Sequence, residues 1–191
     1  MKPNKTNIKA AITAVGGYVP KDFISNKDLE KLVDTNDDWI TARTGIKKRR
    51  ILKAKGKGTS FLAINAAKDL IAKKKIDPET IDLVIVSTIT PDFHVASTAP
   101  TVASAIKAKN AYAYDLSAAC SGFLYGMSTA TSFIESGRYK KVLIIGADMM
   151  SSIVDYTDRS TSILFGDGAG AVLVEPCLLY TSPSPRDLRK S

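Results

Sequence analysis

The sequence predicts an α/β fold, in which a mixed, mostly parallel β-sheet is covered by helices on both faces. Short apolar runs at 83–87 and 142–146 have the length and composition of buried strands. Longer segments with a helical spacing of apolar residues, such as 118–136, lie before and between these runs. Strands that alternate with helices along a chain are typical of layered, mainly parallel sheets.

The first strand is predicted at 8–15, and the pair Gly16 and Gly17 is expected to close it. Asn26 is the expected cap of a short helix that runs through Leu32.

A second short helix is predicted around Trp39, with Asp37 or Asp38 as its cap. The chain from Gly45 onward is rich in lysine and arginine. We expect residues 45–50 to form a loop and an exposed hairpin.

A longer helix is expected to begin at Thr59 or Ser60, and its last turn carries lysines at 73–75, which suit the negative end of the helix dipole. Thr98 can cap a further helix that begins near Pro100, a residue tolerated in a first turn. One face of the longer helix is apolar and consists of Ala63, Ala66, Ala67 and Leu70.

The remaining elements are a strand at 111–116, a helix at 118–136 stopped by Gly137, and strands at 142–146 and 171–175. Past residue 176 the apolar residues no longer recur at the spacing of a strand or of a helix. We interpret 1–176 as one domain and 177–191 as a tail that is disordered or not native to the protein.

Composition favours a globular chain without a membrane span. The 191 residues are 45% hydrophobic, and no apolar stretch approaches the roughly 18 residues of a transmembrane helix. The amino terminus lacks the pattern of a signal peptide, so we expect a cytoplasmic protein. Two cysteines are too few for a disulfide framework, and no spacing of cysteine or histidine indicates a metal site.

The net charge of +8 is concentrated at 47–50, 53–57 and 73–75. Such clusters form a solvated face or attract an acidic partner, for example a phosphate-bearing ligand or an acidic protein. The basic runs lack interleaved aromatic residues, and no nucleic-acid-binding motif is present, so a nucleic acid partner is not expected.

Cys120 is the main candidate for chemistry. It follows the predicted strand at 111–116, among small residues, where a helix begins. Small neighbours let a substrate approach the sulfur, and the amino terminus of a helix favours a thiolate. A buried structural cysteine is the alternative interpretation.

The segment 117–122 (Ser-Ala-Ala-Cys-Ser-Gly) resembles the nucleophile motif of β-ketoacyl-acyl carrier protein synthase III enzymes, which have a thiolase-like fold. Four further segments agree with this family in order and spacing. They are 33–40 (Val-Asp-Thr-Asn-Asp-Asp-Trp-Ile), 43–46 (Arg-Thr-Gly-Ile), 156–159 (Tyr-Thr-Asp-Arg) and 165–171 (Phe-Gly-Asp-Gly-Ala-Gly-Ala). The resemblance covers about residues 8–176 and corresponds to the amino-terminal half of the family.

The resemblance implies that Trp39 stacks on the adenine of coenzyme A (CoA). Arg43 and Arg159 would contact the nucleotide and its phosphates, with Thr35 nearby. Core packing of the tryptophan and surface ion pairs of the arginines are the alternatives. The resemblance also places Val95 against the acyl chain. Since the family takes its catalytic histidine and asparagine from the second half, the single histidine, His94, is not expected to be the base.

Gly166 to Ala171 also fits the pattern of a dinucleotide-binding loop, but that loop must open a helix. Here an apolar strand follows, so we expect a tight turn beneath the active site.

The implied reaction is a two-step acyl transfer. Cys120 accepts a short acyl group from acyl-CoA, and malonyl-acyl carrier protein then loses carbon dioxide and attacks the acyl-enzyme. The expected partners are therefore acyl-CoA and malonyl-acyl carrier protein, with a homodimer at full length and no permanently bound cofactor. A chain without the second half should not condense substrates alone.

Several alternatives remain. Hydroxymethylglutaryl-CoA synthases, thiolases, type III polyketide synthases and synthases of secondary metabolism share the fold and the cysteine. A half-domain that binds CoA without catalysis is an alternative of another class.

Overall fold

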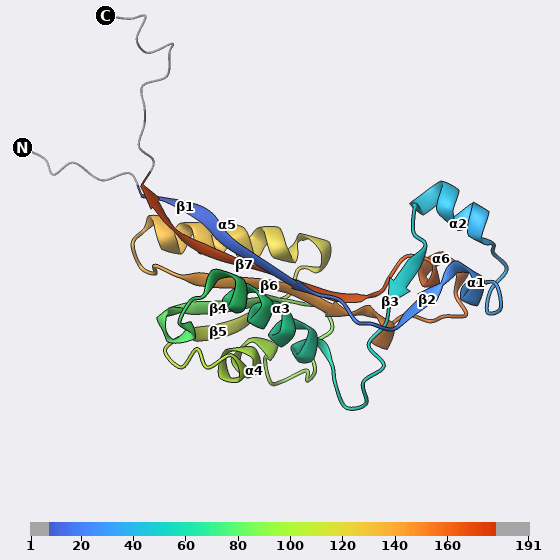
Figure 1. The fold of residues 1–191 in the computed structure, drawn as a ribbon, viewed down its shortest axis with the longest axis horizontal. Helices are drawn as coiled ribbons and strands as arrows, with labels where there is room; N and C mark the ends of the chain where they lie inside the picture. Colours follow the sequence, from blue (N-terminus) through green and yellow to red (C-terminus); the bar gives the residue numbers. More distant parts are fainter. Residues whose placement is uncertain (1–7, 179–191) are drawn as a thin grey trace, which may run out of the picture.

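The computed structural model describes residues 8–178. Figure 1 shows one long twisted sheet flanked by helices, with a smaller group of elements at one end. The strands of this sheet lie in the order β1 (Ile8–Tyr18), β7 (Asp167–Leu178), β6 (Val142–Met149), β4 (Leu83–Ser87) and β5 (Tyr112–Leu116).

The sheet is mixed. β4 runs parallel to both β5 and β6, whereas β7 is antiparallel to β6 and to β1. The parallel strands end together, so the residues that follow β4, β5 and β6 meet at one edge of the sheet, where ligands bind in open α/β folds.

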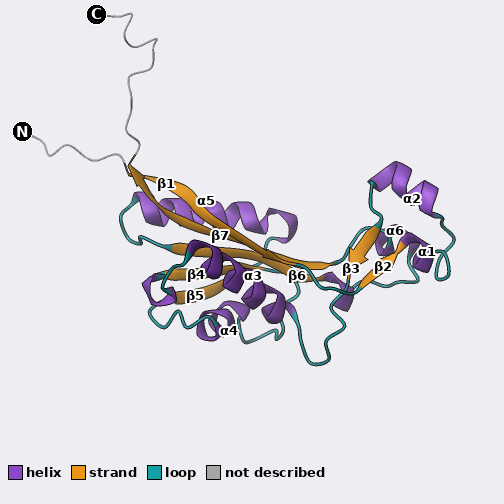
Figure 2. Ribbon diagram, viewed as in Figure 1, coloured by secondary structure: helices purple, strands orange, loops and turns teal. Residues whose placement is uncertain are grey.

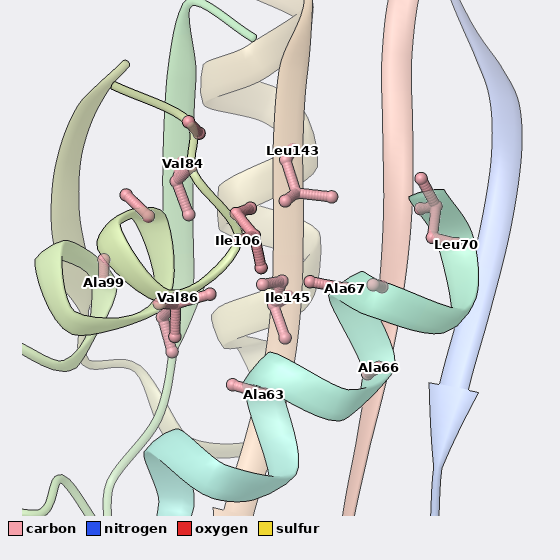
Figure 3. Packing of buried hydrophobic residues seen from close by; sticks show 14 of the residues in the cluster. Ala63, Ala66, Ala67, Leu70, Val84, Val86, Ala99, Ile106, Leu143 and Ile145 are labelled. Atoms are coloured by element: carbon pink, nitrogen blue, oxygen red, sulfur yellow. The ribbon is translucent and has the colours of Figure 1, made fainter. Parts of the chain in front are cut away.

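Helices cover both faces of the sheet, as predicted (Figures 1 and 2). α3 (Thr59–Lys74) and α4 (Thr98–Ala105) pack on one face, and α5 (Gly122–Glu135) packs on the other. The apolar face predicted for α3 is confirmed, because Ala63, Ala66, Ala67 and Leu70 are fully buried. Figure 3 shows these side chains against Leu143, Ile145, Val84 and Val86 of the sheet.

The prediction that Gly16 and Gly17 close the first strand is wrong, since β1 continues to Tyr18. A Cβ atom at Gly16 would lie 2.5 Å from the carbonyl oxygen of Ala66 and 2.6 Å from the backbone nitrogen of Leu70. The glycine therefore lets the backbone of α3 touch the strand, and it does not mark a turn.

Five short elements form a small lobe at one end of the sheet (Figure 1). They are β2 (Phe23–Ser25), α1 (Asn26–Leu29), α2 (Asp37–Thr44), β3 (Lys48–Arg50) and α6 (Arg159–Ser162). Their apolar core contains the buried side chains of Leu29, Ile40 and Ile163. The lobe thus brings two regions together that are more than a hundred residues apart in the sequence.

Two predicted caps in this lobe are wrong by one residue. Ser25, not Asn26, caps α1 in a reciprocal capping box with Asp28, and the helix ends at Leu29, before Leu32. Asn36, not Asp37 or Asp38, caps α2 by accepting a hydrogen bond from the Trp39 backbone. In both cases the cap lies just before the residue that sequence reasoning chose.

The starts of α3 and α4 differ from each other in how well they were predicted. α3 begins at Thr59 as expected, with Gly58 before it, and Ser97 precedes α4. The backbone amides of Thr98 and Ala99 donate to the Asp115 carboxylate from β5, a partner that is distant in sequence. A remote side chain therefore caps α4, and not Thr98.

The hairpin at 45–50 is only partly exposed. Lys48 and Arg50 point to solvent, but Arg49 between them is 2% exposed. Three short 3₁₀ segments complete the described residues, at Pro78–Thr80, Ala119–Ser121 and Met150–Ser152. Strand β7 extends through Leu178, and the remainder of the predicted tail, 179–191, lies outside the described residues. None of the described helices is long and apolar enough to cross a membrane.

Candidate active site

Cys120 lies at the turn from β5 into α5, as predicted. It is the middle residue of the 3₁₀ segment Ala119–Ser121, and its side chain is exposed. Ala119 has a φ of 45°, in the left-handed region that side chains other than glycine rarely adopt. Such outliers persist where the surrounding structure fixes them, and here the strained residue precedes the thiol directly.

Glycines bring the start of α5 against the sheet beneath Cys120. A Cβ atom at Gly122 would lie 3.1 Å from Cβ of Ser87, and one at Gly126 would lie 3.0 Å from Cγ2 of Ile144. The hydroxyl of Ser87 also donates to the Gly122 carbonyl at 3.0 Å. These contacts hold the cysteine above the carboxyl ends of β4 and β6.

The thiol opens onto a hollow of about 370 Å³. Its walls are mostly small residues, so the space next to the sulfur is accessible. The hollow is lined by Ser87, Ala119, Cys120, Phe123, Gly146, Ala147, Asp148, Met150, Gly166, Gly168, Ala169 and Gly170. The glycine-rich segment therefore lies beside the cysteine, and no helix follows it, as expected. The tight turn predicted there is wrong, because Asp167–Ala171 already belong to strand β7 and pair with β6.

Asp148 lines the same hollow and was missed by sequence reasoning. Its Oδ1 accepts hydrogen bonds from the Thr88 hydroxyl at 2.9 Å, the Ile89 amide at 2.9 Å and the Thr90 hydroxyl at 3.1 Å. One carboxylate oxygen thus fixes the turn that follows β4. The only sequence signal was an acidic residue directly after the apolar part of strand β6.

The small lobe brings three of the four predicted nucleotide-binding residues together. The half-buried indole of Trp39 has the Arg43 and Arg159 guanidinium carbons 4.5 Å from its ring centroid. Trp39 and Arg43 come from α2, and Arg159 begins α6. Thr35 precedes α2, and its hydroxyl oxygen is buried without a hydrogen-bond partner among the described residues.

Comparisons with known proteins show which enzymes the chain is similar to. The family model for 3-oxoacyl-[acyl-carrier-protein] synthase III matches residues 114–184. The β-ketoacyl-[acyl-carrier-protein] synthase III of Chlorobium chlorochromatii is 59% identical over 169 residues, which are 88% of this chain and 51% of the relative. Along those residues the chain is similar to synthase III enzymes. It spans about half the length of the curated relatives that it matches.

Solved structures place the chain on the same half of the synthase III fold. The crystal structure of the Aquifex aeolicus enzyme superimposes with a TM-score of 0.82 at 52% identity, covering 88% of this chain and 53% of that enzyme. The priming β-ketosynthase of the R1128 polyketide pathway superimposes with a TM-score of 0.85 at 36% identity, covering 93% and 53%. The thiolase-like fold is therefore confirmed.

The single histidine of the chain lies apart from the cysteine hollow. His94 and Val95 line a second hollow of about 310 Å³, together with residues of β5 and of the turn after β4. Val95 is 99% exposed, so nothing in the described residues covers it. Of the described residues, no group of three or more His, Cys, Asp and Glu could hold a metal ion.

Proposed function

We propose that the protein containing this chain joins a short acyl group from acyl-CoA to malonyl-acyl carrier protein and so initiates fatty acid synthesis. The observation that carries the proposal is the exposed Cys120 thiol at a strained strand-to-helix turn, open to a hollow of small residues. We place this reaction in the cytoplasm and propose acyl-CoA and malonyl-acyl carrier protein as the substrates.

In the proposed first step, the Cys120 thiolate attacks the thioester carbon of acyl-CoA. The carbonyl oxygen gains negative charge, and the backbone N–H of Cys120 is proposed to stabilise it. The carbon–sulfur bond to CoA then breaks, CoA leaves as a thiol after taking up a proton, and the acyl group stays on Cys120.

In the second step, malonyl-acyl carrier protein loses carbon dioxide, and the resulting carbanion attacks the acyl-enzyme. The carbon–carbon bond forms as the bond to Cys120 breaks, so the thiolate is regenerated and a β-ketoacyl-acyl carrier protein leaves. We propose that the histidine and asparagine of this step come from the half of the synthase that the chain does not span. The chain alone is therefore proposed to accept acyl groups without completing the condensation.

Trp39, Arg43 and Arg159, with Thr35 nearby, are the proposed binding residues for the nucleotide of CoA. An indole offers a large flat face for stacking, and the fork of an arginine suits phosphate oxygens. In the present arrangement the guanidiniums approach the ring that an adenine would use. We propose that the base displaces one guanidinium, which then meets the phosphates.

Condensation is best tested after the chain is joined to the carboxyl-terminal half of the Chlorobium chlorochromatii relative. The hybrid should form a β-ketoacyl product from acetyl-CoA with malonyl-acyl carrier protein and not with malonyl-CoA, and Cys120→Ser should abolish it. Condensation that survives Cys120→Ser refutes the nucleophile. A preference for malonyl-CoA favours a polyketide-type synthase instead. CoA binding without acyl transfer favours a non-catalytic half-domain.

A further inference from the structure

The small lobe contains a buried guanidinium that the proposed reaction does not use. Arg49 is 2% exposed and lies in the middle of β3, opposite Ile24 of β2. Its Nε donates to the carbonyl oxygen of Ile163 at 2.8 Å, its Nη2 donates to the same oxygen, and its Nη1 donates to Oδ1 of Asn26.

The Trp39 ring with the guanidiniums of Arg43 and Arg159 against it is called the Trp39 stack below. The two acceptors of Arg49 lie on the two sides of this stack. Ile163 is the carboxyl-terminal cap of α6, the helix that begins with Arg159, so Arg49 satisfies a carbonyl at the negative end of that helix. Asn26 in turn donates from Nδ2 to Oδ1 of Asp37, the first residue of α2, at 2.6 Å.

The same amide nitrogen of Asn26 also donates to the Ile46 carbonyl at 2.9 Å, just beyond the end of α2. A continuous series of hydrogen bonds therefore runs from α6 through Arg49 and Asn26 to both ends of α2. Trp39 and Arg43 lie on one side of this series, and Arg159 lies on the other.

Burying the charged guanidinium of Arg49 costs free energy, so apolar packing alone does not explain its position. Both acceptors of Arg49 are neutral, and no salt bridge of Arg49 is found among the described residues. Burial lowers the pKa of the guanidinium, and the Tyr156 phenol acts in the opposite direction. A planar fork donates to two separate acceptors at fixed angles, which the ammonium of a lysine cannot reproduce.

We propose that Arg49 is a positioning residue, which fixes α2 and α6 relative to each other and thereby holds Trp39 and Arg159 at the spacing that the nucleotide of CoA requires. The inference rests on the proposed function, because it assumes that the Trp39 stack receives the nucleotide. The apolar cluster of Leu29, Ile40 and Ile163 joins the same elements. Apolar packing is non-directional, however, whereas the planar guanidinium of Arg49 fixes the orientation of α2 relative to α6.

The test uses the 191-residue chain, whose only tryptophan is Trp39, so its emission reports on the stack alone. Arg49→Met removes the donors at similar volume, and Arg49→Lys keeps the charge. Arg50→Met is the matched control, because Arg50 lies on the same strand and donates to Pro20 and Lys21 at the surface. The emission is titrated with CoA and with pantetheine, which lacks the nucleotide.

We expect Arg49→Met to shift the Trp39 emission and to weaken CoA binding at least about tenfold. Arg49→Lys should not rescue either property, and pantetheine binding and the Arg50→Met variant should remain at wild-type values. Asn26→Ala, which breaks only the link to α2, should act in the same direction and serves if Arg49→Met does not fold.

Wild-type CoA affinity and emission in both Arg49→Met and Asn26→Ala would overturn the positioning role alone. A wild-type chain whose emission does not respond to CoA would instead refute the nucleotide site itself, and the positioning role with it. Equal losses for CoA and pantetheine would show a general structural role and would also overturn the inference.

Discussion

The guanidinium carbon of Arg159 lies 4.5 Å from the centroid of the Trp39 ring, although 120 positions separate the two residues in the sequence. Arg43 approaches the same ring at 4.5 Å. Two cations against one indole form a site that favours a flat, negatively charged ligand, because the ring offers a stacking surface and the guanidiniums offer donors for phosphate.

Replacing Arg159 with alanine is expected to weaken CoA binding about tenfold, the equivalent of about 1.4 kcal/mol. The variant loses both the cation next to the ring and a fork of phosphate donors. Isothermal titration of the chain with CoA measures the change. Arg138→Ala is the control, since Arg138 lies 5.5 Å from the Tyr139 ring, outside the small lobe. Equal losses in both variants would contradict a specific role.

Gly16→Ala is expected to lower the free energy of unfolding by about 1–3 kcal/mol, the usual cost of overpacking. Its new Cβ would meet the backbone of α3 at 2.5 Å, which no side-chain rotation can relieve. At Gly17 the nearest atom, the Ala169 carbonyl oxygen, is 3.6 Å away. Urea unfolding of Gly16→Ala and Gly17→Ala should therefore differ clearly, and similar midpoints would show that α3 does not touch β1 as described.

Asp148→Ala is expected to destabilise the fold by about 1–3 kcal/mol, because it leaves buried donors of the turn after β4 unpaired. Asp148→Asn keeps an acceptor oxygen and should cost less. The turn borders the Cys120 hollow, so the rate of Cys120 alkylation by iodoacetamide should change more in Asp148→Ala than in Asp148→Asn. Identical alkylation rates in the two variants and the wild type would show that Asp148 does not influence the surroundings of Cys120.

Asp158 gives the small lobe a pH dependence. Hydrogen bonds from the Thr161 and Ser160 hydroxyls and the Ser160 amide hold its pKa below the ordinary value of 3.8. Its contribution to stability is therefore complete above the unfolded-state pKa and is lost as the pH falls through the lower folded-state pKa. The Trp39 emission should change over that acidic range.

Asp158→Asn should remove this part of the acid transition, since the amide does not titrate. If the transition of the Trp39 emission keeps its midpoint and amplitude in Asp158→Asn, another group causes the transition. Asp37 is such a group, because a hydrogen bond from Asn26 chiefly lowers its pKa.

The sequence predicted those features whose signal is local. Strand β4 was predicted at its true bounds, because four consecutive apolar residues, followed by Ser87, stand between polar neighbours. The turn at Cys120 was predicted from small residues between a strand and a helix, and its exposure agrees. The motifs around Trp39 and Arg159 were found through their resemblance to the family.

Features that depend on distant contacts were missed. Gly16 was predicted to close the first strand, because nothing in the neighbouring sequence indicates the approach of α3. Arg49 stands in a run of four basic residues, of which it alone is buried. The local sequence does not distinguish it, because its hydrogen-bond partners are 23 and 114 positions away. Asp148 was not identified as part of the site, because its role follows from the position of the turn after β4.

The most direct test of the account is acyl transfer to the chain itself. The chain is incubated with acetyl-CoA, and intact mass and peptide mapping locate the product in the wild type, Cys120→Ser and Cys177→Ser. We predict one acetyl group on Cys120 in the wild type and in Cys177→Ser, and none in Cys120→Ser. An acetyl group on Cys177, or an equal yield in Cys120→Ser, would contradict the assignment of Cys120 as the nucleophile.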